Sequence, residues 1–219
     1  GRQVLEQIAA EMNHPGPDRR IDRAYYEQSN YFDQGTEHLT DLSSRFQRYR
    51  VEQVLGIRAP QSDDRVVDLG CGWGTFEWAL APTVREIVGV DFAQTSIDLC
   101  EQERARRHLD HVRFVRADAG DTGLPGDAWD HVICADLYEH LYPNDSRRVT
   151  HEAFRLLRSG GHFVVWTPHR GHLIEILKNR RIVGTPDPTH VDYKSMERLK
   201  ALLADAGFEI RSARWVESH

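Results

Sequence analysis

Two carboxylates and an imidazole lie close together in the stretch Asp136-Leu137-Tyr138-Glu139-His140. Asp136 and Glu139 are three residues apart and His140 follows Glu139, so a single helical turn would bring the three side chains to one point. Such a set suits Mg²⁺, Mn²⁺ or Fe²⁺, and any of these ions acidifies a bound hydroxyl group. A further ligand is needed, and His190 in a later Asp-Pro-Thr-His loop is the candidate.

Two other interpretations of this cluster stay open. His140 could act as a general base without a metal, because the pKa of imidazole lies near neutrality. Taken alone, the same residues are more typical of an acidic turn beside a core histidine. A second pair, His169 and His172, follows another β-like run, but its spacing is more typical of a solvated loop and a helix start.

A glycine-rich turn, Asp68-Leu69-Gly70-Cys71-Gly72-Trp73-Gly74-Thr75, lies between a β-like run and a helical stretch. Glycines let a backbone turn sharply and approach a ligand closely. Asp91 closes the next β-like run, 21 positions after Gly70, where a carboxylate can accept both hydroxyls of a ribose. These features predict a nucleoside cofactor.

The glycine spacing discriminates between cofactors. A dinucleotide fingerprint has the pattern G-x-G-x-x-G, in which the third glycine lets the helix meet a pyrophosphate. Here the third glycine comes one place early, and Thr75 stands at the dinucleotide position. Asp68 would repel a pyrophosphate but suits the ammonium of a methionine moiety. The turn therefore favours S-adenosylmethionine (SAM) over NAD.

The elements that position these residues alternate between β-branched runs and helical stretches. This alternation predicts an α/β fold with a doubly wound, Rossmann-like, mostly parallel sheet. The expected strands are 65–70, 86–91, 111–118, 130–136 and 161–167, and the expected helices between them are 74–82, 95–107 and 145–158.

Helical patterns flank this core on both sides. Residues 1–56 are expected to form a helical cover, with helices over 1–12 and 21–56, and residues 57–219 to form the cofactor-binding domain. The aromatic residues Tyr25, Tyr26, Tyr31 and Phe32 of the cover favour core packing over substrate gating. The pattern after residue 168 predicts a helix over 172–181, a loop over 184–190, a helix over 192–206 and a sixth strand over 208–216. A seventh strand, antiparallel to the sixth, has no residues in this sequence, so either the C-terminus is truncated or something else completes the sheet edge.

The bulk properties narrow the partners. The net charge of -6 and the pI of about 6.1 disfavour a nucleic-acid substrate. No apolar run approaches the roughly 18 residues that cross a bilayer, so no membrane partner is expected. Three cysteines, Cys71, Cys100 and Cys134, are an odd number with no close spacing, which argues against a disulfide framework and a thiolate zinc site and predicts the reducing cytoplasm as the compartment.

The ordered motifs D-x-G-x-G-x-G, V-G-V-D, R-A-D-A and D-x-V-x-C resemble those of class I SAM-dependent methyltransferases, from about Arg50 to Trp215. The resemblance implies that the glycine-rich turn passes under the methionine part, that Asp91 holds the ribose and that Phe92 contacts adenine. By their own chemistry, Asp118 could instead be a helix cap and Phe92 a core residue. The cofactor residues that the resemblance implies are Arg50, Asp68, Gly70, Cys71, Gly72, Asp91, Phe92, Asp118, Ala119 and Ala135.

Within that class, the chain resembles the ubiquinone-biosynthesis O-methyltransferases and the small-RNA 3′-terminal 2′-O-methyltransferases. Their shared pattern is E-x-x-E-H with a later loop histidine; here it is D-x-x-E-H, and the first ligand is one methylene shorter. The resemblance implies a metal held by Asp136, Glu139, His140 and His190 that binds two neighbouring hydroxyls. It also places Arg50 against the SAM carboxylate and Ala135 beside the nucleoside.

These observations predict a SAM-dependent O-methyltransferase, assisted by Mg²⁺ or another divalent cation, with Asp136, Glu139 and His140 as catalytic residues. The expected acceptor is a hydroxylated small molecule: a catechol, a sugar diol or a natural-product scaffold. The alternatives are a metal-free methyltransferase with His140 as base, an RNA 2′-O-methyltransferase and a non-catalytic SAM-binding module.

Overall fold

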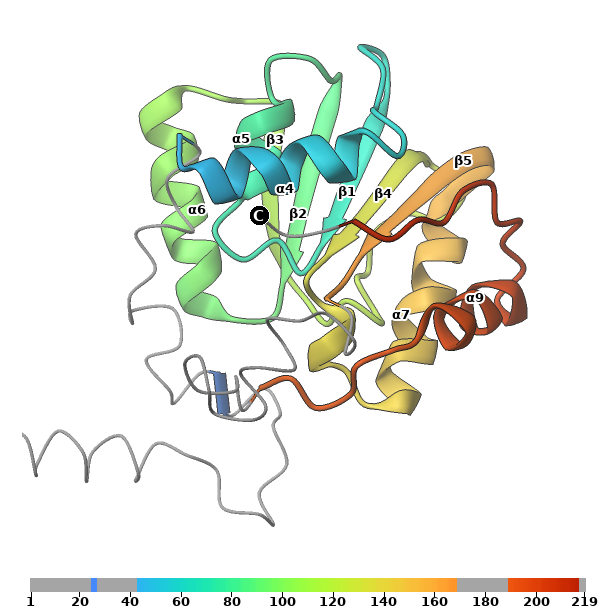
Figure 1. Cartoon of the computed structure of the whole chain (residues 1–219). Helices are drawn as coiled ribbons and strands as arrows, with labels where there is room; N and C mark the ends of the chain where they lie inside the picture. The colour runs from blue at the N-terminus through green and yellow to red at the C-terminus, as the bar shows by residue number, and fades with distance from the viewer. Residues whose placement is uncertain (1–24, 27–42, 169–188, 217–219) are drawn as a thin grey trace, which may run out of the picture.

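A computed structural model describes residues 25–26, 43–168 and 189–216. Five parallel strands form one sheet in the order β3-β2-β1-β4-β5 (Figure 1), which confirms the predicted doubly wound α/β fold. Because β4 pairs with the other edge of β1, the strand order reverses between β1 and β4, which is where sheets of this kind bind ligands. The strands are β1 (Arg65–Leu69), β2 (Glu86–Asp91), β3 (Val112–Arg116), β4 (Trp129–Ala135) and β5 (Leu157–Trp166).

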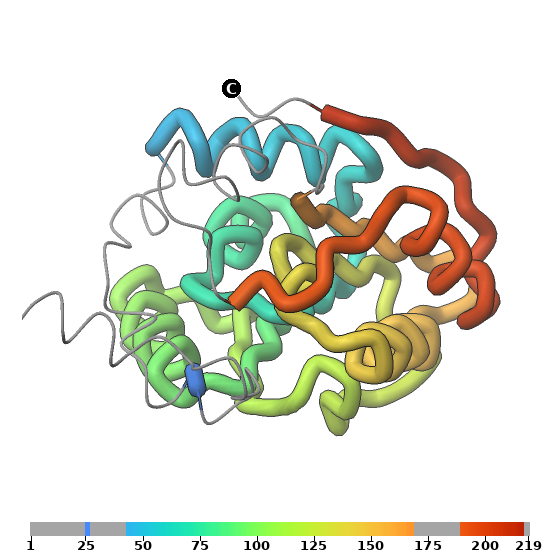
Figure 2. Tube along the Cα trace, turned by 60° about the horizontal axis from the view of Figure 1, so that its bottom comes forward, coloured from blue at the N-terminus to red at the C-terminus, as the bar shows by residue number. Residues whose placement is uncertain are grey.

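Helices cover both faces of the sheet, and Figure 2 shows the sheet between them. The helices α4 (Arg45–Leu55), α5 (Thr75–Leu80) and α6 (Gln94–Arg107) pack on one face, and α7 (Pro143–Leu156) and α9 (Met196–Asp205) on the other. Successive strand residues supply the two cores: Val66 of β1 belongs to the first, and Val67 and Leu69 to the second. All three valine and leucine side chains are fully buried.

Local signals explain where the helices begin. The Oγ of Ser44 accepts a hydrogen bond from the backbone N–H of Gln47 (3.2 Å) and so caps α4. Ser195 caps α9 in the same way through Arg198 (3.2 Å), which is why this helix starts at Met196 rather than at the expected residue 192. α7 begins with Pro143 at its first position, where the missing N–H costs nothing.

The expected sixth strand over residues 208–216 is wrong. This segment leaves α9 and runs outside β5 towards α4 (Figure 1), where Arg214 donates to the carbonyl of Gln53 (3.2 Å). A strand is stabilised by backbone hydrogen bonds to a neighbouring strand, and none of the strands in the described part of the chain pairs with this segment. Two of their apolar side chains also remain exposed: Ile210 is 38% and Trp215 57% accessible.

Several expectations lie outside the described residues. They are the helix over 1–12, most of the segment 21–44, the helix over 172–181 and the pair His169 and His172. The N-terminal cover therefore stays a prediction, apart from α4 and the short helical piece at Tyr25 and Tyr26. Within the described ranges, none of the helices has the length and apolar character needed to cross a membrane.

Candidate functional site

The glycine-rich turn follows the carboxyl end of β1 directly. Gly70, Gly72 and Gly74 all have positive φ angles, of 79°, 52° and 73°, and α5 begins at Thr75. Residues with a Cβ atom rarely adopt this left-handed backbone conformation, so the turn requires glycine. A Cβ atom on Gly72 would meet no atom within 4 Å, whereas one on Gly74 would lie 2.8 Å from the Trp78 ring. Gly72 thus exposes its backbone to open space beside the turn.

Both backbone polar groups of Gly72, the N–H and the carbonyl, are hydrogen-bonded. Its N–H donates to the Asp91 carboxylate at the end of β2 (3.1 Å), and its carbonyl accepts from the Ser96 hydroxyl (2.5 Å) and the Cys100 thiol (3.3 Å). The second Asp91 oxygen accepts from the N–H of Ala93 (2.9 Å). Burial raises the pKa of Asp91, and these N–H groups oppose the rise. The turn and the expected ribose carboxylate therefore form one rigid unit.

Arg50 of the covering helix α4 pairs with Asp136, which follows β4, and its charge also acts on Asp68 near the carboxyl end of β1. Its Nε donates to the Asp136 carboxylate (2.5 Å), and its guanidinium lies over the Phe76 ring, 5.1 Å from the centroid. Asp68 is 2% accessible, and burial raises its pKa to about 7, with Arg50 opposing the rise. A cationic group of a ligand beside Asp68 would favour the ionised carboxylate, and that carboxylate would in turn bind the cation.

Asp136 does not join the cluster that its spacing predicts. It has a left-handed backbone with a φ of 55°, and its N–H donates to the Trp166 carbonyl (2.9 Å). This conformation places its side chain on Arg50. The group of possible metal ligands among the described residues consists of Glu139, His140 and His190, whose donor atoms lie within 4.8 Å of one another.

Glu139 and His140 lie on a short 3₁₀ turn (Tyr138–His140) after β4, and His190 reaches them from a distant loop. The Glu139 Oε1 and the His140 Nε2 are 4.0 Å apart, and the two imidazole centroids are 4.8 Å apart. Glu139 is 1% accessible, and Thr167 at the end of β5 donates to its Oε2 (2.9 Å). Burial raises the pKa of Glu139, and the charge of Asp136 adds to the rise.

One contact of His140 favours a particular ring nitrogen as the carrier of its proton. The His140 Nδ1 lies 3.1 Å from the Thr189 carbonyl oxygen, which can only accept, so this contact favours a proton on Nδ1. In the neutral ring the lone pair then belongs to Nε2, the atom that faces Glu139. The Tyr26 hydroxyl also contacts Nδ1 (3.0 Å), and the Tyr26 ring packs edge-on against Phe92, with centroids 5.3 Å apart. Tyr26 thus connects the chemical cluster to the expected adenine side.

The remaining expected cofactor residues lie along the same sheet edge. Phe92 is half-buried rather than a core residue. Asp118 is exposed and caps a turn: its carboxylate accepts from the N–H of Gly120 (2.7 Å) and from Arg148 (3.2 Å). Ala119 is half-buried, and Ala135 at the end of β4 is 3% accessible. Cys71 and the other two cysteines are buried free thiols.

Sequence reasoning missed three residues that support the cluster. Thr167 is held against Glu139, Tyr193 contacts the His190 Nδ1 through its hydroxyl (2.8 Å), and Lys194 lies buried beneath the turn. A threonine that directly follows a strand could have been noticed. Nothing in the local sequence distinguishes Lys194 from a solvated lysine.

The comparisons with known proteins find methyltransferases both among relatives in sequence and among solved structures. A family profile described as "Methyltransferase domain" matches residues 66–161. An uncharacterised methyltransferase, YcgJ, of Bacillus subtilis is 26% identical over 178 residues, which cover 75% of this chain and 69% of that protein. A probable SAM-dependent methyltransferase of Mycobacterium tuberculosis is 30% identical over 177 residues, which cover 80% of this chain and 60% of that protein. The crystal structure of a SAM-dependent methyltransferase from Archaeoglobus fulgidus, 26% identical, superposes with a TM-score of 0.60 over 74% of this chain and 69% of the other.

Proposed function

The chain belongs to the class I SAM-dependent methyltransferases, and we propose that it transfers the methyl group of SAM to a hydroxyl group of a small molecule. The observation that carries this proposal is the meeting of Glu139, His140 and His190 at the carboxyl end of β4, beside the glycine-rich turn. The two places are in contact, because a Cβ atom on Gly70 would lie 3.2 Å from Leu137 at the start of the cluster's turn. The methyl donor and a proton acceptor would therefore lie side by side.

The cofactor would be held by the residues of the turn and its neighbours. Asp68 would accept the ammonium of the methionine moiety, and Asp91 would hold the ribose through its carboxylate. Ribose hydroxyls would add to the Gly72 N–H as donors to Asp91, since a carboxylate accepts several hydrogen bonds. Arg50 would reach the cofactor carboxylate from its position on Asp136. The faces of Phe92 and Tyr26 would bound the adenine side.

The chemistry asks for a group that removes a proton from the acceptor, because the sulfonium already activates the methyl group. His140 suits this role, since its Nδ1–H is bound by the Thr189 carbonyl and its Nε2 carries the lone pair. Glu139 beside it, in its ionised form, would stabilise the imidazolium that forms when His140 takes the proton. O-methyl transfer thus has a base that is oriented before substrate binds.

A divalent ion fits the donor chemistry of the same three side chains. A carboxylate with two imidazoles matches Mn²⁺, Fe²⁺, Co²⁺ or Zn²⁺ better than Mg²⁺, which prefers oxygen ligands. When bound, the ion would lower the pKa of a hydroxyl group of the acceptor. Two ligand atoms on one ion lie at most about 4.2 Å apart, twice a bond of about 2.1 Å, so binding would draw these side chains together. Asp136 would act on the cluster through its charge while it remains paired with Arg50.

The acceptor class follows from this geometry. A six-coordinate ion such as Mn²⁺, held by three protein ligands, would have room for two neighbouring oxygens of an acceptor, so a catechol or a vicinal diol is the substrate that we propose. The net charge of -6 disfavours a phosphate backbone as the bound group. A hydroxylated small molecule is therefore preferred over RNA, and strong salt dependence of acceptor binding would reverse that preference.

The test is a calorimetric titration of Mn²⁺ and Mg²⁺ into protein saturated with S-adenosylhomocysteine (SAH). Compared with the parent, His140→Gln, Glu139→Gln and His190→Gln should each lose Mn²⁺ binding, and Mg²⁺ should bind more weakly than Mn²⁺ throughout. His151→Gln, an exposed histidine of α7, is the matched control and should bind both ions as the parent does. SAH affinity should stay at the parent value in every variant.

Methyl transfer from labelled SAM to a panel of catechols and vicinal diols tests the reaction itself. Activity that disappears with a chelator and returns with Mn²⁺ supports the metal-assisted form. Activity that survives the chelator but is lost in His140→Gln supports His140 as a base without a metal. Transfer that persists in His140→Gln and Glu139→Gln at the parent rate would refute the assignment of this cluster.

A further inference from the structure

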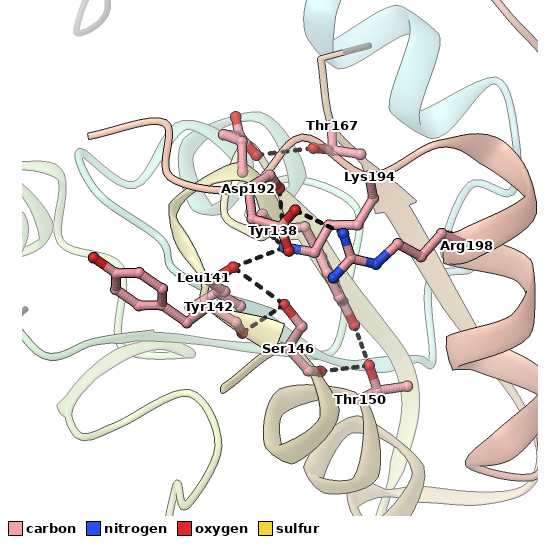
Figure 3. Close-up of polar contacts among 10 residues, drawn as sticks. Tyr138, Leu141, Tyr142, Ser146, Thr150, Thr167, Asp192, Lys194 and Arg198 are labelled. Atoms are coloured by element: carbon pink, nitrogen blue, oxygen red, sulfur yellow. Dashed lines mark hydrogen bonds and ion pairs between the residues drawn. The ribbon is translucent and has the colours of Figure 1, made fainter. Parts of the chain in front are cut away.

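Lys194 is a buried ammonium group directly beneath the chemical cluster. Its side chain is 1% accessible, although it lies in the irregular segment before α9. The Nζ donates to three backbone carbonyl oxygens, those of Tyr138 (2.5 Å), Leu141 (2.7 Å) and Asp192 (3.1 Å) (Figure 3). An ammonium has three N–H donors, and each of them has an acceptor here.

The charge of Lys194 is balanced nearby. The Asp192 Oδ2 lies 3.4 Å from the Nζ, and the other oxygen of that carboxylate accepts from Arg198 of α9 (2.7 Å). The Tyr138 ring centroid is 6.0 Å from the Nζ. Burial lowers the pKa of Lys194, and Asp192 opposes the change. Removing a charge from water is costly, so such an arrangement persists only where its partners are well ordered.

The three carbonyls belong to the two segments that carry the cluster. Tyr138 and Leu141 enclose Glu139 and His140 on the 3₁₀ turn, and Asp192 follows His190 by two residues. Lys194 therefore ties the turn after β4 to the loop that brings His190. The backbone N–H of Asp192 adds one more link, a hydrogen bond to the Glu139 carbonyl (3.1 Å).

The turn is itself anchored to the core beneath it. The Tyr138 hydroxyl meets the Thr150 hydroxyl (2.6 Å), which donates to the Ser146 carbonyl (2.7 Å) in α7 (Figure 3). Because the Thr150 hydroxyl donates its hydrogen bond to the Ser146 carbonyl, the Tyr138 hydroxyl is the donor to Thr150. The turn thus has a fixed position, and Lys194 transmits that position to the loop.

We propose that Lys194 is a positioning residue that sets the distance of His190 from Glu139 and His140 by occupying a cage of three carbonyl oxygens. The proposal rests on the proposed function of that cluster and names the part of the chain that assembles it. Lys194 touches neither substrate nor cofactor in this scheme. It serves as a built-in monovalent cation among the carbonyl oxygens of the two segments.

The first test compares Lys194→Met with Lys200→Met, an exposed lysine of α9. With SAH bound, the Mn²⁺ dissociation constant should rise by about 10- to 100-fold in Lys194→Met, as for other residues that orient metal ligands. The SAH dissociation constant should remain at the parent value, and Lys200→Met should match the parent in both measurements. A folded Lys194→Met that binds Mn²⁺ as tightly as the parent would overturn the proposal.

Chemical rescue separates positioning from general support of the fold. In Lys194→Ala the three carbonyls remain, and NH₄⁺ or K⁺ is small enough to enter the space that the side chain leaves. Added NH₄⁺ should restore most of the Mn²⁺ affinity, while tetramethylammonium at equal ionic strength should not, because it has no N–H and is too large. Equal effects of the two salts would contradict the carbonyl cage. Lys194→Arg should not rescue either, since a planar guanidinium cannot place three donors on one point.

A third measurement remains informative if the parent binds no Mn²⁺, a result that would refute the metal in the proposed function but not the positioning role. Amide hydrogen exchange reports whether the two segments stay together. In Lys194→Met the amide of Asp192, which bonds to Glu139, should exchange at least about tenfold faster, while amides of β1 should not change. Unchanged exchange at Asp192 would overturn the proposal.

A milder variant covers the case in which Lys194→Met does not fold. Asp192→Asn keeps the side-chain shape and removes the charge beside the Nζ. It should accelerate exchange of the same amide and weaken Mn²⁺ binding, each by less than Lys194→Met does. Parent behaviour of a folded Asp192→Asn in both measurements would also contradict the proposal.

Discussion

Gly72 and Gly160 both have a left-handed backbone conformation, but they lie towards opposite ends of the parallel strands. Both have a positive φ, of 52° and 79°, and at both a Cβ atom would meet nothing within 4 Å. Gly72 follows the carboxyl end of β1, whereas Gly160 lies in the first part of β5, at the edge where parallel strands begin. Alanine at each position therefore introduces the same strain, and only one of the two methyl groups faces the proposed cofactor site.

The magnitude follows from the left-handed conformation. A residue with a Cβ atom destabilises the folded state by about 1–2 kcal/mol in this conformation. Alanine also lowers the entropy of the unfolded chain, which stabilises the folded state by about 0.4–1 kcal/mol. Each variant should lose roughly 1 kcal/mol of unfolding free energy in urea. Gly72 cannot relax away from a ligand, because Asp91, Ser96 and Cys100 all hold its peptide. The methyl group of Gly72→Ala should therefore weaken SAH binding by at least about tenfold, or about 1.4 kcal/mol.

The assay is calorimetric titration of SAH into the parent, Gly72→Ala and Gly160→Ala, with urea unfolding of each protein. Parent affinity is expected for Gly160→Ala and a large loss for Gly72→Ala. If Gly72→Ala binds SAH as the parent does, the cofactor does not pass over this turn. If Gly160→Ala loses as much affinity as Gly72→Ala, the effect comes from instability rather than from contact.

Three further outcomes concern stability. Burial raises the pKa of Asp68 from 3.8 to about 7, so between these pH values the folded protein keeps a proton that the unfolded chain releases. The contribution of Asp68 to the unfolding free energy therefore falls as the pH rises from about 4 to 7. Urea unfolding of Asp68→Asn should lack that decline. His131 has the opposite sign, because burial beside His162 lowers its pKa from 6.5 to about 4 and the unfolded chain binds the extra proton. Its contribution is lost as the pH falls from 6.5 towards 4, so the parent should lose roughly 1–2 kcal/mol more than His131→Phe between pH 6.5 and pH 5, and equal losses would refute this. Tyr138→Phe removes one buried hydrogen bond to Thr150 without leaving a donor unpaired, and should cost about 1 kcal/mol of unfolding free energy with SAH affinity unchanged.

Local patterns were sufficient for the core of the fold. The β-branched runs predicted all five strands of the sheet to within a few residues, because buried parallel strands need continuous apolar stretches. The glycine-rich turn was equally readable, since its left-handed φ angles exclude most other residues. The sixth strand could not be judged locally, because a strand requires a partner that no pattern within residues 208–216 specifies.

The candidate site shows the same division between local and long-range information. The sequence by itself determined that Glu139 and His140 share a turn at the end of β4 and that Asp91 follows the glycine-rich turn by one strand, because spacing and strand order are local properties. Only the tertiary structure decided that Asp136 pairs with Arg50, 86 positions away, and leaves the cluster to Glu139, His140 and His190. It also decided that Lys194 is buried against backbone carbonyls rather than solvated. A charged side chain has many possible partners at equal cost in the extended chain, and the packing of distant elements selects among them.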